Sequence, residues 1–186
     1  MRRAASLRTR RYTFVLEDLN DPHNISAVLR TCECFGIQEV HVIEEIRPFR
    51  ISRPIVKGAA QWLDIVRWTS RKECLDHLRG RGFRIAVAST RAEKSFHALD
   101  LEPATAIYMG TEFQGPSEHI NSAADVIFKL PQHGFTESLN VSVCAGMIVA
   151  HLDRHMDDHG REHYTLNTDQ QEALVEQWSL AHDLED

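Results

Sequence analysis

Three polar segments of the sequence carry residue types that could do chemistry. The first runs from Leu19 to Asn24 and leads into a segment that reaches Arg30. Asn24 is a candidate helix N-cap, because its side-chain oxygen can accept a hydrogen bond from a first-turn N–H. Arg30 falls on the face opposite the apolar residues of that helix. Helical periodicity alone therefore predicts that Arg30 is a solvent-exposed arginine.

The second segment covers residues 109–117. Gly110 and Gly115 have the G-x-x-x-x-G spacing of a phosphate-binding loop, but Pro116 stands where a lysine would neutralise nucleotide phosphates. A nucleoside triphosphate site is therefore not expected. What remains is a glycine turn that lets the backbone approach a flat or bulky ligand, together with one carboxylate, Glu112. A plain strand-to-helix turn is the alternative interpretation.

The third segment covers residues 130–140 and runs into a helical pattern that is apolar nearly all round, over 139–155. Ser138 and Asn140 stand at the entry of this buried helix. Each must find a partner, since an unpaired buried polar group costs about 1–3 kcal/mol. Helix capping explains Ser138 better than it explains Asn140. The sequence has no G-x-G-x-x-G, so an ordinary dinucleotide site is not predicted.

A run of histidines at every fourth position is a further candidate site. On a continuous helix these residues would form a stripe able to bind a metal ion. The stripe consists of His151, His155, His159 and His163. Gly160 and the charged residues around it favour a solvated helix end instead, so no metal site is expected.

The elements that must position these segments alternate between strand and helix patterns. Strands are predicted at 12–17, 39–43, 65–68, 83–88, 104–109 and 125–130. Helices are predicted at 24–35, before Trp62, and at 71–79, 116–123 and 139–155. This order predicts an α/β fold with a mostly parallel sheet and helices on both faces. Ligands of such sheets bind where strands end, and the three polar segments lie there.

The composition is that of a globular protein. A length of 186 residues suits one domain, and 42% hydrophobic with 26% charged residues excludes disordered and collagen-like chains. The four cysteines form no C-x-x-C pair, which fits thiols in a reducing cytosol. Neither a membrane span nor a signal peptide is recognisable. We therefore expect a cytoplasmic protein without a membrane anchor.

The net charge of −6 by itself argues against a nucleic-acid partner, but the charge is unevenly distributed. Residues 1–11 contain five arginines and no acid, whereas ten acids and two bases follow from Asp153 onward. We expect a basic N-terminal arm at 1–11, a domain at 12–156 and an acidic tail at 157–186. Thr168–Gln171 has the form of a capping box and predicts a short amphipathic helix in the tail, interpreted as a docked element or dimer contact.

Together the three segments resemble the SpoU branch of the SPOUT superfamily of RNA methyltransferases, and within it the tRNA guanosine-2′-O-methyltransferases. The first motif reads Asn24-x-x-Ala27-x-x-Arg30 and ends at Phe35-Gly36. The second reads Gly110-x-Glu112-x-x-Gly115. The third reads Leu130-Pro131 followed by Ser138-Leu-Asn-Val-Ser-Val143. The resemblance covers about Tyr12 to Leu152.

The resemblance implies a C-terminal trefoil knot, S-adenosylmethionine as the cofactor, and a homodimer with its active site near the subunit interface. No metal is implied. The family's reacting centre maps onto Asn24, Arg30, Glu112, Ser138 and Asn140. Cofactor contacts are expected around Ala88, Gly110, Leu130 and Leu139.

The implied reaction is an in-line displacement in which a ribose 2′-hydroxyl takes a methyl group from a sulfonium. It needs alignment, which supplies roughly 7–11 kcal/mol, and removal of the hydroxyl proton. The family proposal makes the motif arginine the general base, yet a guanidinium stays protonated. We therefore expect Arg30 to stabilise the developing oxyanion or hold the adjacent phosphate, oriented by Asn24 and Glu112. The sequence identifies no general base.

Guanosine 18 in the tRNA D-loop is the expected target, because a short basic arm and no separate RNA-binding domain precede the first motif. Alternatives are a tRNA wobble ribose, ribosomal RNA, a non-catalytic RNA-binding module and a nucleotide-binding regulator. Gln132-His133 and Phe113-Gln114 depart from the family pattern in positions that affect cofactor contacts and phosphate binding. The residues expected to hold RNA are Arg2, Arg3, Arg8, Arg10 and Arg11.

Overall fold

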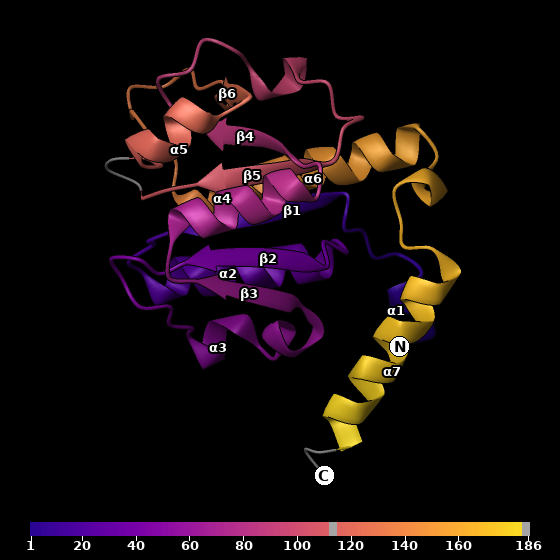
Figure 1. Ribbon diagram of the computed structural model, residues 1–186. Helices are drawn as coiled ribbons and strands as arrows, with labels where there is room; N and C mark the ends of the chain where they lie inside the picture. The colour runs from indigo at the N-terminus through magenta and orange to yellow at the C-terminus, as the bar shows by residue number, and fades with distance from the viewer. Residues whose placement is uncertain (112–114, 184–186) are drawn as a thin grey trace.

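The computed structural model describes residues 1–111 and 115–183. Among these residues, six strands form one sheet in the order β3-β2-β1-β5-β4-β6, and every neighbouring pair is parallel (Figure 1). The strands are β1 (Tyr12–Glu17), β2 (Glu39–Ile43), β3 (Asp64–Trp68), β4 (Arg84–Ala88), β5 (Thr105–Met109) and β6 (Val126–Phe128). The predicted parallel α/β fold is confirmed, and the strand boundaries agree to within two residues.

The helices lie between the strands and after the last one. They are α1 (Arg2–Ala5), α2 (Pro22–Cys34), α3 (Arg53–Val56), α4 (Arg71–Gly80), α5 (Glu118–Ala123), α6 (Val141–Asp158) and α7 (Thr168–Asp183). Short 3₁₀ turns occupy Ala59–Trp62, Phe96–Ala98 and Arg161–His163. None of the helices in the described ranges combines the length and hydropathy that a membrane crossing requires.

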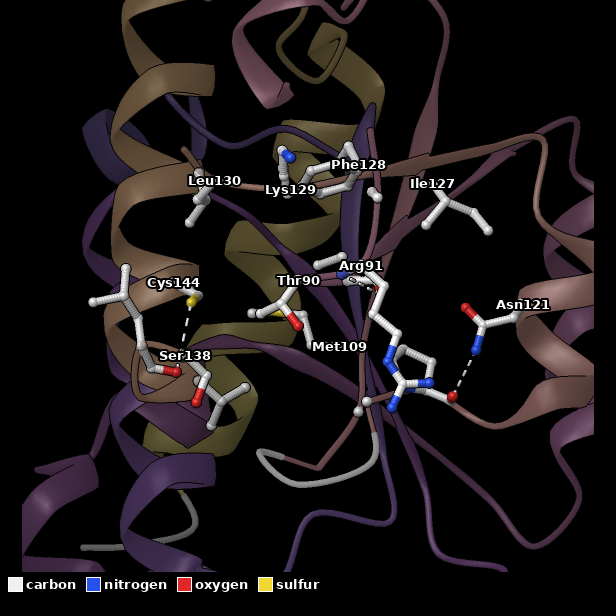
Figure 2. Close-up of a pocket in the computed structure, with 18 of the residues that line it drawn as sticks. Thr90, Arg91, Met109, Asn121, Ile127, Phe128, Lys129, Leu130, Ser138 and Cys144 are labelled. Atoms are coloured by element: carbon white, nitrogen blue, oxygen red, sulfur yellow. Dashed lines mark hydrogen bonds between the residues drawn. The ribbon is translucent and has the colours of Figure 1, made fainter. Parts of the chain in front are cut away.

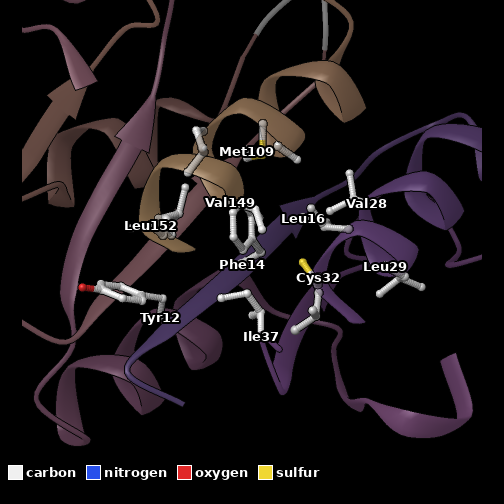
Figure 3. Packing of buried hydrophobic residues seen from close by; sticks show 14 of the residues in the cluster. Tyr12, Phe14, Leu16, Val28, Leu29, Cys32, Ile37, Met109, Val149 and Leu152 are labelled. Atoms are coloured by element: carbon white, nitrogen blue, oxygen red, sulfur yellow. The ribbon is translucent and has the colours of Figure 1, made fainter. Parts of the chain in front are cut away.

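Helices cover both faces of the sheet, as predicted. On one face, α2 and α6 pack on alternate β1 side chains such as Phe14 and Leu16 (Figure 3). On the other face, α4 and α5 pack on Val15 and on Tyr108 of β5. Because β1 is central and covered on both faces, all six of its residues are buried, and buried and exposed residues do not alternate along it.

Three helix starts differ from the sequence expectation. Asp21, not Asn24, caps α2, with Pro22 at the first helical position, where its missing N–H costs nothing. Asn140 caps α6 by accepting a hydrogen bond from the Ser142 N–H, so capping explains Asn140 rather than Ser138. The capping box of α7 uses Asn167 and Gln170, whose side chains each accept from the other's backbone N–H, one residue earlier than predicted.

The N-terminal segment is folded onto the C-terminal helix. Ala5 of α1 joins Leu166, Leu174 and Trp178 in a small separate core, and Figure 1 shows α1 beside α7. The helix α7 has 16 residues, so the expected short tail helix is corrected to a long one. The basic N-terminal segment 1–11 does not extend away from the fold, because α1 is docked on α7 and Ala5 and Arg8 are buried.

Three of the five N-terminal arginines form ion pairs or hydrogen bonds with other residues of the chain. Arg8 is 3% exposed, pairs with Glu33 at 2.7 Å and stacks over Trp178. Arg10 pairs with Asp64 at 2.6 Å. Arg11 donates to the Glu102 carbonyl and lies over the Tyr164 ring. The expectation that Arg8 contacts RNA is therefore corrected: its guanidinium faces the protein. The trefoil knot stays a prediction.

Candidate active site

A cavity of about 730 Å³ opens at the carboxyl ends of β4, β5 and β6. Its floor is formed by the strand ends Ala88, Met109 and Phe128, and one wall by the start of α6. Figure 2 shows that residues from the 88–94, 109–111, 115–121 and 127–144 segments converge on it. This is the edge of a parallel sheet at which ligands bind. The cavity therefore lies where the second and third motifs were expected to act.

The turn after β5 demands glycine. A Cβ on Gly110 would lie 2.2 Å from the Gly115 carbonyl carbon and the Pro116 nitrogen. Gly115 has φ +68°, a left-handed conformation that side chains disfavour. The turn closes by a hydrogen bond from the Gly115 N–H to the Thr111 carbonyl, 2.8 Å long. The chain thus folds back on itself and presents bare backbone to the cavity.

A buried carboxylate anchors this turn to the sheet. Glu17, the last residue of β1, is 3% exposed, and its Oε2 accepts from the Ser117 N–H at 2.9 Å. Arg71, at the start of α4, approaches Glu17 Oε1 at 3.0 Å. The same guanidinium bonds Asp18 and Glu45, each at 2.9 Å. The cavity wall is therefore tied to β1 through a charge network that periodicity does not reveal.

The four residues expected to contact the cofactor all line this one cavity. They are Ala88, Gly110, Leu130 and Leu139. Ser138 lines it as well. The tertiary structure thus brings together residues from three separate loops that the sequence analysis grouped by resemblance.

The first motif contacts the start of α6. Asn24 accepts from the Asn140 side-chain amide at 2.9 Å, so the first and third motifs are joined directly. Arg30 is exposed on α2 and is not among the residues that line the cavity in the described part of the chain. Glu112 lies outside the described residues.

Several cavity residues were missed by the sequence analysis. Arg91, Lys94 and Lys129 stand on the lining, and Figure 2 shows the Arg91 side chain extending along it. Cys144 of α6 also lines it, with its thiol 3.9 Å from the Leu139 carbonyl. The loop after β4 had one usable signal, since cations cluster at Arg91 and Lys94 directly after a buried strand.

The histidine stripe is broken by the end of α6. The helix ends at Asp158, and Gly160 then turns the chain with φ +87°, so His163 stands on a separate 3₁₀ turn. His155 instead contacts the Tyr164 hydroxyl at 3.2 Å. Burial lowers the pKa of His151, and the nearby His97 lowers it further. In the described ranges no three His, Cys, Asp or Glu side chains form a group that could hold a metal ion.

Residues 11–150 match the family model described as the SpoU rRNA Methylase family. The chain belongs to this family. The match includes all three motifs, the cavity and the sheet. The resemblance identified from the motifs is therefore confirmed over most of the chain.

Individual SpoU proteins are similar over comparable lengths. A Borreliella burgdorferi protein named tRNA (guanosine(18)-2′-O)-methyltransferase is 34% identical over 148 residues, which are 79% of this chain and 68% of that one. The crystal structure of the A. aeolicus TrmH/SpoU tRNA modifying enzyme has a TM-score of 0.87 and 25% identity, covering 98% of this chain and 93% of that chain. The SpoU methyltransferase AviRb from Streptomyces viridochromogenes, in complex with AdoMet, shares the fold, with a TM-score of 0.74, 19% identity and coverage of 83% and 64%.

Proposed function

We propose that this protein transfers a methyl group from S-adenosylmethionine to the ribose 2′-hydroxyl of guanosine 18 in tRNA. The observation that carries the proposal is the convergence of second- and third-motif residues on one cavity of a SpoU fold. The name of the Borreliella relative supports tRNA guanosine 18 as the target. Because tRNA is the proposed substrate, we also propose that the protein works in the cytoplasm.

The cavity fits the proposed cofactor. Its volume of about 730 Å³ lies within the usual range for small-molecule sites. The bare backbone at Gly110 permits close approach of a planar base, and Leu130 and Met109 supply apolar walls. Glu93 and Lys94 on the lining offer charges for the amino acid end of the molecule. When bound, S-adenosylmethionine supplies an electrophilic methyl group on a sulfonium.

The bound cofactor would supply its methyl group to the 2′-oxygen: the oxygen–methyl bond would form as the sulfur–methyl bond breaks, the neutral thioether would leave as S-adenosylhomocysteine, and the hydroxyl proton would pass to solvent water. We assign Ser138 and Asn140 to positioning at the reacting centre, with Asn24 fixing the Asn140 amide. Arg30 remains a cation and stabilises the developing negative charge or holds the adjacent phosphate. Glu112, which the resemblance implies is part of the reacting centre, keeps the role of orienting Arg30 that we expect from the sequence.

The position of Arg30 outside its own chain's cavity supports a homodimer with the active site near the interface. The α6 face beside Asn140 exposes Val143 at 49% and Met147 at 43%. These two residues are four apart and so form one apolar patch on the helix. Contact of this patch with a second copy would place first-motif residues close to a cavity.

The test is incubation with methyl-labelled S-adenosylmethionine and unmodified tRNA, followed by mapping of the labelled nucleoside. We expect label on the ribose of guanosine 18. A tRNA with 2′-deoxyguanosine at that position is the matched control and should take no label. Arg30→Ala should reduce the rate at least about tenfold, equivalent to 1.4 kcal/mol.

Each other outcome contradicts a defined part of the proposal. Label on a base refutes ribose methylation. Label on the wobble ribose, or on ribosomal RNA alone, refutes the target. Absence of label with unimpaired RNA binding favours a non-catalytic RNA-binding module. Tight binding of NAD or ATP without affinity for S-adenosylmethionine favours a nucleotide-binding regulator.

A further inference from the structure

A basic segment follows β2, and it begins at the carboxyl ends of the strands, where the cavity also opens. We define the basic segment as residues 46–57, which include α3. It contains four cations spaced three or four residues apart, and all four are exposed: Arg47, Arg50, Arg53 and Lys57. None of them has a carboxylate partner within the described residues, in contrast to Arg8 and Arg10 of the N-terminal segment.

The acids close to the basic segment form their ion pairs with arginines outside it. Glu44 binds Arg67 through both carboxylate oxygens, at 2.7 and 2.9 Å. Glu45 and Asp18 both bind Arg71. Arg67 and Arg71 come from β3 and α4, outside the segment. Arg67 offsets Glu44, but the single charge of Arg71 is shared by Glu17, Asp18 and Glu45. These four carboxylates and two arginines sum to −2, so the four exposed cations still leave a net charge of +2 in this region.

The backbone of the basic segment is fixed in place. Asp18 Oδ1 accepts from the N–H groups of Ile46 and Arg47, at 2.8 and 3.1 Å. Glu44 Oε2 accepts from the Phe49 N–H at 3.0 Å. Side chains outside the segment, at Asp18 and Glu44, thus order its main chain and do not pair with its cations. A preorganised set of cations loses less entropy on binding an anion than a flexible arm would.

The basic segment is joined to the first motif. The Ser26 hydroxyl of α2 accepts from the Ser52 N–H at 2.7 Å. Arg30 is four residues after Ser26, so it lies on the same side of α2, one turn along. Figure 1 shows α3 at the sheet edge formed by β3, with α2 close by. The strand order places β1, and with it the first-motif loop, between the basic segment and the cavity.

We propose that the basic segment binds the sugar-phosphate backbone of the RNA substrate and guides it toward the first motif. The proposal rests on the proposed function and replaces the N-terminal arm as the main RNA contact. Four exposed cations without ion-pair partners in the described residues, on a fixed backbone, are suited to phosphate contacts, which position an RNA without reading its sequence. Exposed Ile46 and Ile51 stand among them and offer apolar contact to riboses.

The test compares two double variants of the full-length protein that each remove two exposed cations. Arg47→Gln/Arg50→Gln alters the basic segment, and Arg2→Gln/Arg3→Gln alters the N-terminal segment. Affinity for unmodified tRNA is measured as a function of salt concentration. Affinity for S-adenosylmethionine, whose cavity contains none of these residues, shows whether each variant is folded.

For Arg47→Gln/Arg50→Gln we expect roughly tenfold weaker tRNA binding at low salt and a salt slope reduced by about 1.5–2, with unchanged cofactor affinity. Arg2→Gln/Arg3→Gln should change both quantities less. Equal tRNA affinity and slope in wild type and Arg47→Gln/Arg50→Gln would overturn the proposal, as would a larger loss in the N-terminal variant. Failure of the proposed function appears separately, as wild-type protein that binds tRNA but transfers no label.

Discussion

Removal of the Glu17 carboxylate tests whether the cavity wall depends on β1. Glu17→Ala deletes the acceptor of the Ser117 N–H, whose hydrogen bond is 2.9 Å long, and one of three carboxylates around Arg71. Glu17→Gln is the matched variant, because its amide oxygen can still accept from Ser117 while the charge is lost. The two variants therefore separate the hydrogen bond from the ion pair.

The expected loss follows from what each change leaves unpaired. Breaking a fully buried ion pair costs about 3–5 kcal/mol, but Arg71 keeps Asp18 and Glu45 and its side chain is 20% exposed, so this figure is an upper bound. A hydrogen bond to a charged group contributes about 1.5–3 kcal/mol. We therefore expect Glu17→Ala to cost about 2–3 kcal/mol, or roughly 4–12 °C in Tm for a chain of this size. Glu17→Gln should cost less.

Cofactor binding distinguishes an anchor of the cavity from a purely structural pair. If release of Ser117 leaves the binding-competent turn populated in about a tenth of molecules, the apparent Kd for S-adenosylmethionine rises about tenfold. Calorimetric titration below the Tm of both variants measures this. A lower Tm with unchanged cofactor affinity in Glu17→Ala would refute the reasoning. Equally weakened cofactor affinities in Glu17→Ala and Glu17→Gln would also refute it.

Three further predictions concern the cavity, acid stability and the terminal helices. Gly110→Ala should weaken cofactor binding at least about tenfold by calorimetry, because its Cβ meets backbone at 2.2 Å, whereas Gly134→Ala, whose Cβ meets nothing within 4 Å, should not. Burial raises the pKa of Glu39, but hydrogen bonds from His41 and Arg81 outweigh it and lower the pKa to about 2. Ionised Glu39 therefore stabilises the fold by up to about 3 kcal/mol above the ordinary glutamate pKa of roughly 4.3, and this stabilisation is lost as pH falls toward 2. In denaturant titrations, the difference in unfolding free energy between wild type and Glu39→Gln should shrink over that pH window. A constant difference would contradict this. Trp178→Ala should weaken the packing of α7 and speed its proteolysis, while Trp178→Phe should have a smaller effect and both variants should keep their cofactor affinity. Equal proteolysis rates of wild type and Trp178→Ala would contradict the docking of α7.

The tautomer of His41 follows from the two hydrogen bonds of its ring. Indole Nε1 of Trp68 can only donate, and it lies 2.9 Å from His41 Nδ1, which must accept. The Nε2 of His41 then carries the proton and donates to Glu39 at 2.8 Å. The carboxylate thus receives one neutral and one charged donor, since Arg81 approaches it at 2.6 Å. Glu39 is therefore held ionised by partners from β2 and by the residue after α4.

The sequence by itself determined the order and type of the main elements and the three motifs. Strand and helix periodicity is a local signal, and burial of each element's apolar face reinforces it. The β1 and β2 boundaries were predicted to the residue. The second and third motifs could be assigned to one site because loops after parallel strands must meet at one edge.

Only the tertiary structure decided where the arginines point and what anchors the cavity. Arg8 finds Glu33 across 25 residues, Arg10 finds Asp64 across 54, and Glu17 reaches Ser117 across 100. Such pairings depend on which elements become neighbours, and a charged residue carries no periodic signal of its partner. The five N-terminal arginines were therefore predicted to form one RNA-binding arm, while the net charge of the chain concealed the exposed cations of the basic segment. Local patterns specify elements, and three-dimensional proximity specifies which charges remain available to a ligand.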